Sequence, residues 1–129
     1  METQYLEVGD NKWGVLVCYD YTMLDWDDMW AIMRSFGVSN AKANEAIGVL
    51  GGLNTGMAIS NDDIRMSVVF VSDATSASEW WSTLSHELYH VSAAIIDYYG
   101  ESYEREPAAY LYGELIRMAV QNISEPCYV

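Results

Sequence analysis

The chain has 129 residues, of which 51% are hydrophobic and 19% charged, and its formal net charge is −13. This composition is typical of a single globular domain over residues 1–129 and argues against disorder. Six Lys and Arg residues spread along the chain cannot form a basic patch, which excludes nucleic acid as a partner. The negative charge also opposes binding to an anionic membrane surface, and it favours solubility or cationic partners.

Cysteine usage and hydropathy indicate the cell compartment. The two cysteines, Cys18 and Cys127, are too few and too far apart to form a disulfide framework. The first ten residues lack the apolar region of a signal peptide. No stretch approaches the 18 apolar residues that a membrane-spanning helix requires. We therefore expect a reduced, cytoplasmic protein that binds no membrane.

Hydrophobic periodicity predicts an α+β fold. In chain order we expect a strand or loose arm over 1–9, a strand over 13–19, a helix from Thr22 or Asp25 to Phe36, a helix over 39–50, strands over 55–60 and 64–72, a helix over 78–99 and a helix over 103–123. Asn61, Asp62 and Asp63 are turn residues and predict that the two later strands form a hairpin. Arg65 and Ser67 predict that one face of the second of these strands is partly exposed to water.

The sharpest chemical signal is an H-E-x-x-H motif, His86-Glu87-Leu88-Tyr89-His90, which contains both histidines of the chain. Apolar residues recur every three or four positions across 78–99, and Gly100 follows as a helix-ending residue. His86 and His90 are then one helical turn apart, so both imidazoles can reach the same metal ion. Glu87 is rotated off that line and can reach a water molecule without binding the metal.

A catalytic zinc ion takes three protein ligands, so one ligand must come from outside the motif. The candidate carboxylates are Asp97, Glu101, Glu104, Glu106 and Glu114. Asp97 lies about 10 Å beyond His90 along the same helix, which is too far to complete the site. Glu101 is similarly remote, and Glu114 should overshoot the histidines.

A final helix that starts near Tyr103 and runs antiparallel to the motif helix favours Glu106 over Glu104. Ala109 and Gly113 follow Glu106 on the same helical face. These small residues would let the two helices pack closely and bring the carboxylate within reach of the metal. We therefore predict Zn²⁺ as the cofactor, held by two histidines and Glu106.

Zinc and Glu87 together predict a hydrolytic reaction. A bound zinc ion lowers the pKa of water toward ~7. Glu87 would act as the general base and later return the proton to a leaving amine. The predicted activity is hydrolysis of a peptide bond, and the predicted substrate is a peptide or a protein.

The motif, followed sixteen residues after His90 by Glu106-Pro107-Ala108-Ala109-Tyr110, resembles the gluzincin metallopeptidases. The resemblance is greatest to small single-domain forms: minigluzincins, the ImmA/IrrE type with its E-x-x-A-N stretch, and short phage-encoded proteins with the same motif. It covers roughly residues 55–120 and implies a small zincin-like domain in which a short antiparallel sheet or hairpin packs on the metal helix and on a C-terminal ligand helix. It also implies that Glu106 is the third ligand and that a substrate pairs with an edge strand, the place that 64–72 would fill.

The chain departs from this family at Tyr110, where the E-x-x-A-N pattern has Asn and thermolysin-like members have Asp. Because both histidines are committed to the metal, a tyrosine, Tyr103 or Tyr110, would have to stabilise the oxyanion. We take Tyr110 as the candidate, with packing as the alternative role of either residue.

Two other functions stay open from the sequence. The chain could be a non-catalytic, zinc-pinned protein-interaction module, with a phage as one origin. It could also be an inhibitor that binds another protein through its acidic surface. Glu87 favours catalysis, because a purely structural zinc site needs no carboxylate beside its metal.

Overall fold

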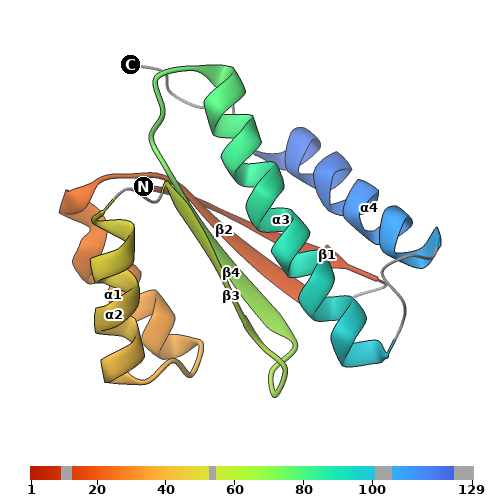
Figure 1. The fold of residues 1–129 in the computed structure, drawn as a ribbon, viewed down its shortest axis with the longest axis horizontal. Coiled ribbons are helices and arrows are strands. Elements are labelled where there is room, and N and C mark those ends of the chain that lie inside the picture. Colours follow the sequence, from red (N-terminus) through yellow and green to blue (C-terminus); the bar gives the residue numbers. More distant parts are fainter. Residues whose placement is uncertain (10–12, 53–54, 101–105, 124–129) are drawn as a thin grey trace.

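The computed structural model describes residues 1–9, 13–52, 55–100 and 106–123, apart from the side chains of residues 106 and 107. Its elements are β1 (Glu2–Val8), β2 (Trp13–Tyr21), the 3-10 turn η1 (Met23–Asp25), α1 (Trp26–Ser35), α2 (Asn40–Leu50), β3 (Gly56–Asn61), β4 (Met66–Ser72), α3 (Ala77–Tyr99) and α4 (Glu106–Asn122). One sheet separates α1 and α2 on one face from α3 and α4 on the other (Figure 1). The predicted α+β class is confirmed.

The sheet has four strands in the order β1-β2-β4-β3. The hairpin expected from the turn residues is present as β3 and β4, which pair antiparallel. The sheet as a whole is mixed, because β2 and β4 run parallel, so the expected antiparallel hairpin is part of a larger sheet of four strands. A parallel pair needs a long connection, and α1, α2 and β3 supply it.

β3 is the edge strand that contacts α3. Residues 64–72 were expected to provide this edge. β4 instead lies between β2 and β3, and its residues 67–71 are buried. The expectation of a partly wet face was also wrong, because Ser67 is fully buried and Arg65 lies in the turn before the strand. Ser67 tolerates burial because its hydroxyl accepts a hydrogen bond from Trp13 Nε1 at 3.0 Å and lies 2.6 Å from Ser60 Oγ.

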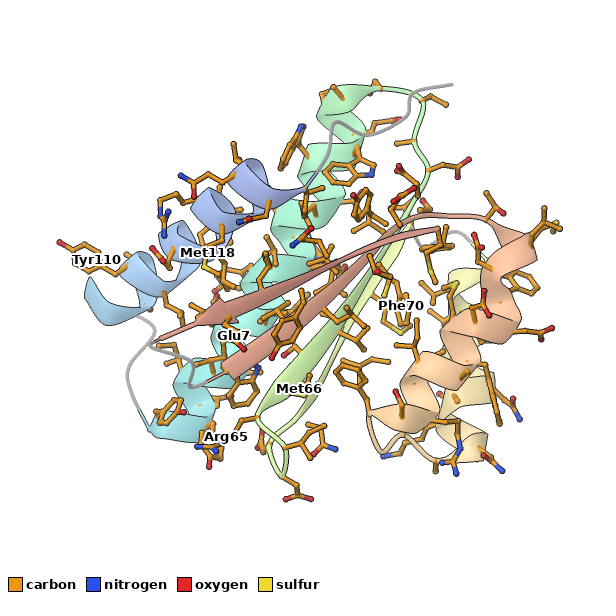
Figure 2. All side chains as sticks on the ribbon, turned by 180° about the vertical axis from the view of Figure 1, so that it is seen from behind. Glu7, Arg65, Met66, Phe70, Tyr110 and Met118 are labelled. Carbon is orange, nitrogen blue, oxygen red and sulfur yellow. The ribbon has the colours of Figure 1, made fainter. Side chains whose placement is uncertain are left out.

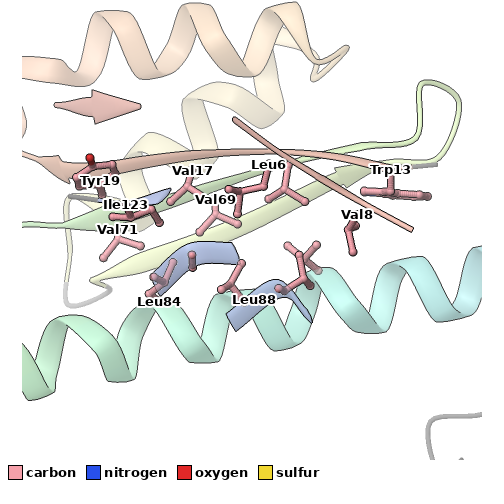
Figure 3. Packing of buried hydrophobic residues seen from close by; sticks show 14 of the residues in the cluster. Leu6, Val8, Trp13, Val17, Tyr19, Val69, Val71, Leu84, Leu88 and Ile123 are labelled. Carbon is pink, nitrogen blue, oxygen red and sulfur yellow. The ribbon is translucent and has the colours of Figure 1, made fainter. Parts of the chain in front are cut away.

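Two hydrophobic cores hold the layers together. Leu84 and Leu88 of α3 pack against Val17, Val69 and other residues on one face of the sheet (Figure 3). The second core lies between α1, α2 and the opposite face, where Phe70 points (Figure 2).

A bulge at Asp20 turns the last residue of β2 to the other face of the sheet. Asp20 has a positive φ of 58°, and the register of β2 against β4 shifts between Tyr19 and Tyr21. These two tyrosines therefore enter opposite cores, although alternation along a regular strand would place them on the same face. The Asp20 carboxylate accepts a hydrogen bond from Trp80 Nε1 at 3.0 Å, which ties the bulge to α3.

The helix ends follow local rules that the sequence predicts. Ser76 accepts a hydrogen bond from the backbone N–H of Glu79 at 3.2 Å and starts α3. Gly100 ends α3 with a φ of 73°, a conformation that favours glycine. The start of the last helix at Tyr103 falls outside the described residues, and α4 begins at Glu106. Within the described part of the chain, no helix is both long enough and apolar enough to cross a bilayer.

Replacing Ser67 with alanine should lower the free energy of unfolding by about 1–3 kcal/mol, because it leaves a buried indole N–H without its acceptor. Urea unfolding followed by tryptophan fluorescence measures this change. Ser72→Ala, at the half-buried end of the same strand, is the matched control and should cost less than about 0.5 kcal/mol. Equal losses in the two variants would contradict the role of the Trp13–Ser67 hydrogen bond.

Candidate metal centre

The two histidines lie side by side on the outer face of α3. Leu88 is fully buried against the sheet, and His86 and His90 each lie two residues from it. At 3.6 residues per turn, both imidazoles are therefore about 160° around the helix from the core. They are exposed to solvent, and their Nε2 atoms are 3.1 Å apart.

This arrangement fits a shared zinc ion. Two nitrogen ligands at 2.0–2.1 Å from one tetrahedral ion lie about 3.3 Å apart, close to the distance between the two Nε2 atoms. In the absence of an ion, the same approach is a hydrogen bond in which one ring donates and the other accepts. The predicted convergence of His86 and His90 is thus present in the structure.

Glu87 occupies a different environment from its two neighbours. Glu87 is 7% exposed. It follows His86 by one residue, which is about 100° around the helix, and it therefore lies on the side of α3 that faces the edge strand. Burial raises the pKa of the Glu87 carboxyl, and the nearby His86 and His90 act in the opposite direction. A raised pKa suits a general base, because such a base is most effective when its pKa lies near the working pH of about 7.

Gly56, the first residue of β3, permits the close approach of the edge strand to Glu87. A Cβ atom at Gly56 would lie 2.7 Å from Thr83 Cγ2 and 3.2 Å from Glu87 Cγ. One residue earlier, Thr55 Oγ1 lies 3.2 Å from Thr83 Oγ1, which ties the start of β3 to the same helical turn. The Glu87 side chain therefore lies directly against the beginning of the edge strand.

A polar recess adjoins Glu87 toward the N-terminus of α3. It encloses about 650 Å³ and is lined by hydroxyl groups, including those of Thr55 and Thr83, and by the carboxylate of Asp73. The nearby hydroxyl of Tyr21 is the one buried side-chain polar atom of the described residues that lacks a hydrogen-bond partner. Burial, followed by the charges of Asp73 and Glu87, raises the pKa of Tyr21 to about 12, so this hydroxyl stays protonated.

The side chain of Glu106, the predicted third ligand, lies outside the description. Among the side chains that are described, no group of three His, Cys, Asp or Glu residues is placed to hold a metal ion. The backbone of Glu106 opens α4, which turns back alongside α3 (Figure 1). Glu114 is held by Arg117 through two hydrogen bonds, which lowers its pKa. Glu101 and Glu104 are not among the described residues.

The contact between α3 and α4 differs from the expected one. Ala109 and Gly113 are exposed, and a Cβ atom at Gly113 would meet nothing within 4 Å, so these small residues do not bring the two helices together. Tyr112 does so instead: its hydroxyl donates a hydrogen bond to the Ser85 carbonyl oxygen at 3.2 Å. Glu106 precedes Tyr112 by six residues, about 9 Å along the helix axis.

Among the described residues, the tyrosine that packs against a histidine is Tyr89, not Tyr110. Tyr110 is 74% exposed, and its side chain projects away from the rest of the protein (Figure 2). Tyr103 lies outside the described residues. The ring of Tyr89 packs edge-on against both His90 and Tyr112. Helical periodicity could have identified Tyr112, because it lies three residues before Leu115 on the buried face of α4.

Comparison with known proteins identifies no relative: no family model, no curated protein and no solved structure matches the chain. The resemblance to gluzincins therefore stays a prediction from the motif. The case for a metal centre depends on the geometry of His86, Glu87 and His90.

Gly56→Ala should destabilise the protein by about 1–3 kcal/mol, because the added methyl group overpacks the contact between β3 and α3. The strain falls on Thr83 and Glu87, so the variant should also disturb the candidate site. Thermal or urea unfolding measures the stability. Gly48→Ala is the matched control: it lies in α2 with open space around it and should stabilise the protein by up to about 1 kcal/mol. If Gly56→Ala were neutral, the close approach of the strand would be contradicted.

Proposed function

We propose that the chain is a zinc-dependent peptidase. The observation that carries the proposal is the placement of three polar side chains within one turn of α3. Two exposed imidazoles converge to 3.1 Å between their Nε2 atoms, and the Glu87 side chain between them is buried against the start of an edge strand. His86, His90 and Glu106 would hold the ion.

Bound zinc supplies Lewis acidity and lowers the pKa of water toward ~7. Glu87 accepts a proton from the attacking water while the new C–O bond forms at the scissile carbonyl carbon. It then returns this proton to the amine nitrogen as the C–N bond breaks, so one water molecule is divided between the two products. Burial of Glu87 supports this role, because it raises the proton affinity of the carboxylate.

The edge strand supports a peptide as the substrate. β3 begins at Gly56, which lies against Glu87. It is hydrogen-bonded to β4 on one side, so an extended chain can pair with its other side. Such pairing would carry successive peptide bonds past the carboxylate. The polar recess beside Thr83 gives the peptide room beyond the start of the strand.

The alternative is a non-catalytic, zinc-pinned interaction module. The exposure of both histidines on the outer face of α3 favours it, because a partner protein could complete an exposed zinc site. Burial of Glu87 favours the peptidase instead. A structural site gains nothing from a carboxylate whose charged form is penalised by burial.

The purified protein should retain close to one zinc ion per chain after dialysis, and His86→Ala with His90→Ala should abolish it. Glu106→Ala should weaken zinc binding by more than the roughly 10- to 100-fold that loss of an outer-sphere partner costs. Elemental analysis and competition with a chromophoric chelator measure stoichiometry and affinity. Ser82→Ala, an exposed position one turn before His86, and Glu104→Ala are the controls. Strong loss in Glu104→Ala with none in Glu106→Ala would move the third ligand to Glu104.

Glu87→Gln should keep the zinc ion and the fold but reduce hydrolysis by at least about 100-fold, because the amide cannot accept a proton. The assay is mass-spectrometric detection of new termini in a proteome-derived peptide library. Asp97→Asn, an exposed carboxylate on the same helix, should cleave like the wild type. Equal cleavage by Glu87→Gln would remove Glu87 as the base. A zinc-loaded wild type that cleaves nothing would favour the interaction module.

A further inference from the structure

A groove of about 770 Å³ lies between α2 and β3, on the face of the sheet that α3 does not cover. Ala46 and Val49 line it from α2, and Met57 and Ile59 line it from β3. The turn between β3 and β4 closes one end. We name this feature the α2–β3 groove. The candidate metal centre uses none of these residues.

The edge of β3 connects the groove to Glu87. Within the described sheet, β3 has a hydrogen-bonded neighbour on one side, β4, and such an edge leaves backbone N–H and C=O groups for a further strand. Alternate residues of β3 face opposite ways: Met57 and Ile59 pack toward the core of α1 and α2, and Ala58 packs toward α3. A strand added at this edge would follow the same alternation.

The added strand would therefore present one set of side chains to α3 and the other set to the groove. Gly56 lies against Glu87, and Met57 and Ile59 follow it by one and three residues. At about 3.3 Å per residue, the groove accepts side chains that lie about 3–10 Å along the strand from the position beside Glu87. An apolar residue at every second position fits this geometry.

The charge at the closed end of the groove determines the sign of the charge that a bound peptide can carry there. Glu45, Asp62 and Asp63 line the groove together with a single cation, Lys42. Asp62 and Asp63 are exposed in the turn, so their field attracts a positive charge on a ligand. The formal net charge of −13 opposes a second copy of this chain as the occupant, because like-charged molecules repel each other.

We propose that the α2–β3 groove binds an extended peptide that carries apolar side chains two residues apart and a basic residue beside Asp62 and Asp63. If the groove selects a substrate, this role rests on the proposed peptidase function. As a peptide-binding site, it does not depend on hydrolysis.

The test uses the full chain with Glu87→Gln, which binds peptides without cleaving them. The immobilised protein is mixed with a random decapeptide library, and the retained peptides are sequenced by mass spectrometry. We expect at least tenfold enrichment, over the input library, of peptides with apolar residues two positions apart and Lys or Arg toward one end. No enrichment above that on an unrelated immobilised acidic protein would overturn the proposal.

Substitutions in the same background locate the binding. Val49 is 40% exposed, so Val49→Trp can fill the groove without disturbing the core, and it should reduce the apolar enrichment at least tenfold. Val120→Trp, a 58% exposed position on α4, is the matched control and should leave it unchanged. Asp62→Asn with Asp63→Asn should abolish the basic preference, whereas Asp27→Asn with Asp28→Asn on α1 should not. Enrichment that survives Val49→Trp would overturn the groove as the binding site.

The outcome separates this inference from the peptidase. Enrichment that depends on Val49, in a protein whose wild type cleaves no peptide, supports the groove and removes the hydrolytic function. Cleavage by the wild type that is unchanged by Val49→Trp supports the peptidase and overturns the groove. A concentration-dependent dimer that Val49→Trp disrupts, with no peptide enriched, would assign the groove to a second copy and overturn the proposal.

Discussion

The rotation of α3 on the sheet decides what each residue of the candidate site can do. Leu84 and Leu88 are fully buried, and each contributes about 1.5–3 kcal/mol by leaving water. With Leu88 against the sheet, successive residues turn by about 100°, which directs His86 and His90 outward and Glu87 to the edge strand. Rotation that put Tyr89 in the place of Leu88 would turn Glu87 outward and His86 toward the core. The core therefore determines which groups can bind a metal and which can act as a base.

Much of this arrangement is visible in the sequence, because it depends on local periodicity and on helix ends. The helix expected over 78–99 is Ala77–Tyr99, since an apolar stripe, a serine cap and a left-handed glycine are all features of short stretches. The hairpin of β3 and β4 was predicted for the same reason, from turn residues between two apolar runs. The convergence of His86 and His90 follows from their spacing alone.

The errors concern relations between distant segments. The pairing of β2 with β4 joins strands that are about fifty residues apart, and no local pattern specifies it. Ser67 was expected to face water, because no local pattern reveals its hydrogen bond with Trp13, which lies 54 residues away in the chain. The contact between α3 and α4 was expected at Ala109 and Gly113, whereas Tyr112 makes it. The distance from Glu106 to the histidines is a relation of the same kind, and it depends on the segment between α3 and α4.

Gly56 connects the chemistry to recognition. Because it has no side chain, the edge strand can lie against Glu87 and Thr83, and a peptide paired with β3 would start at the carboxylate. The residues that follow face the α2–β3 groove at alternate positions. A one-residue slip of such a peptide would move every groove-facing side chain to the other face of the sheet. Apolar side chains held in the groove would thus set the register, and the register would decide which peptide bond lies beside Glu87.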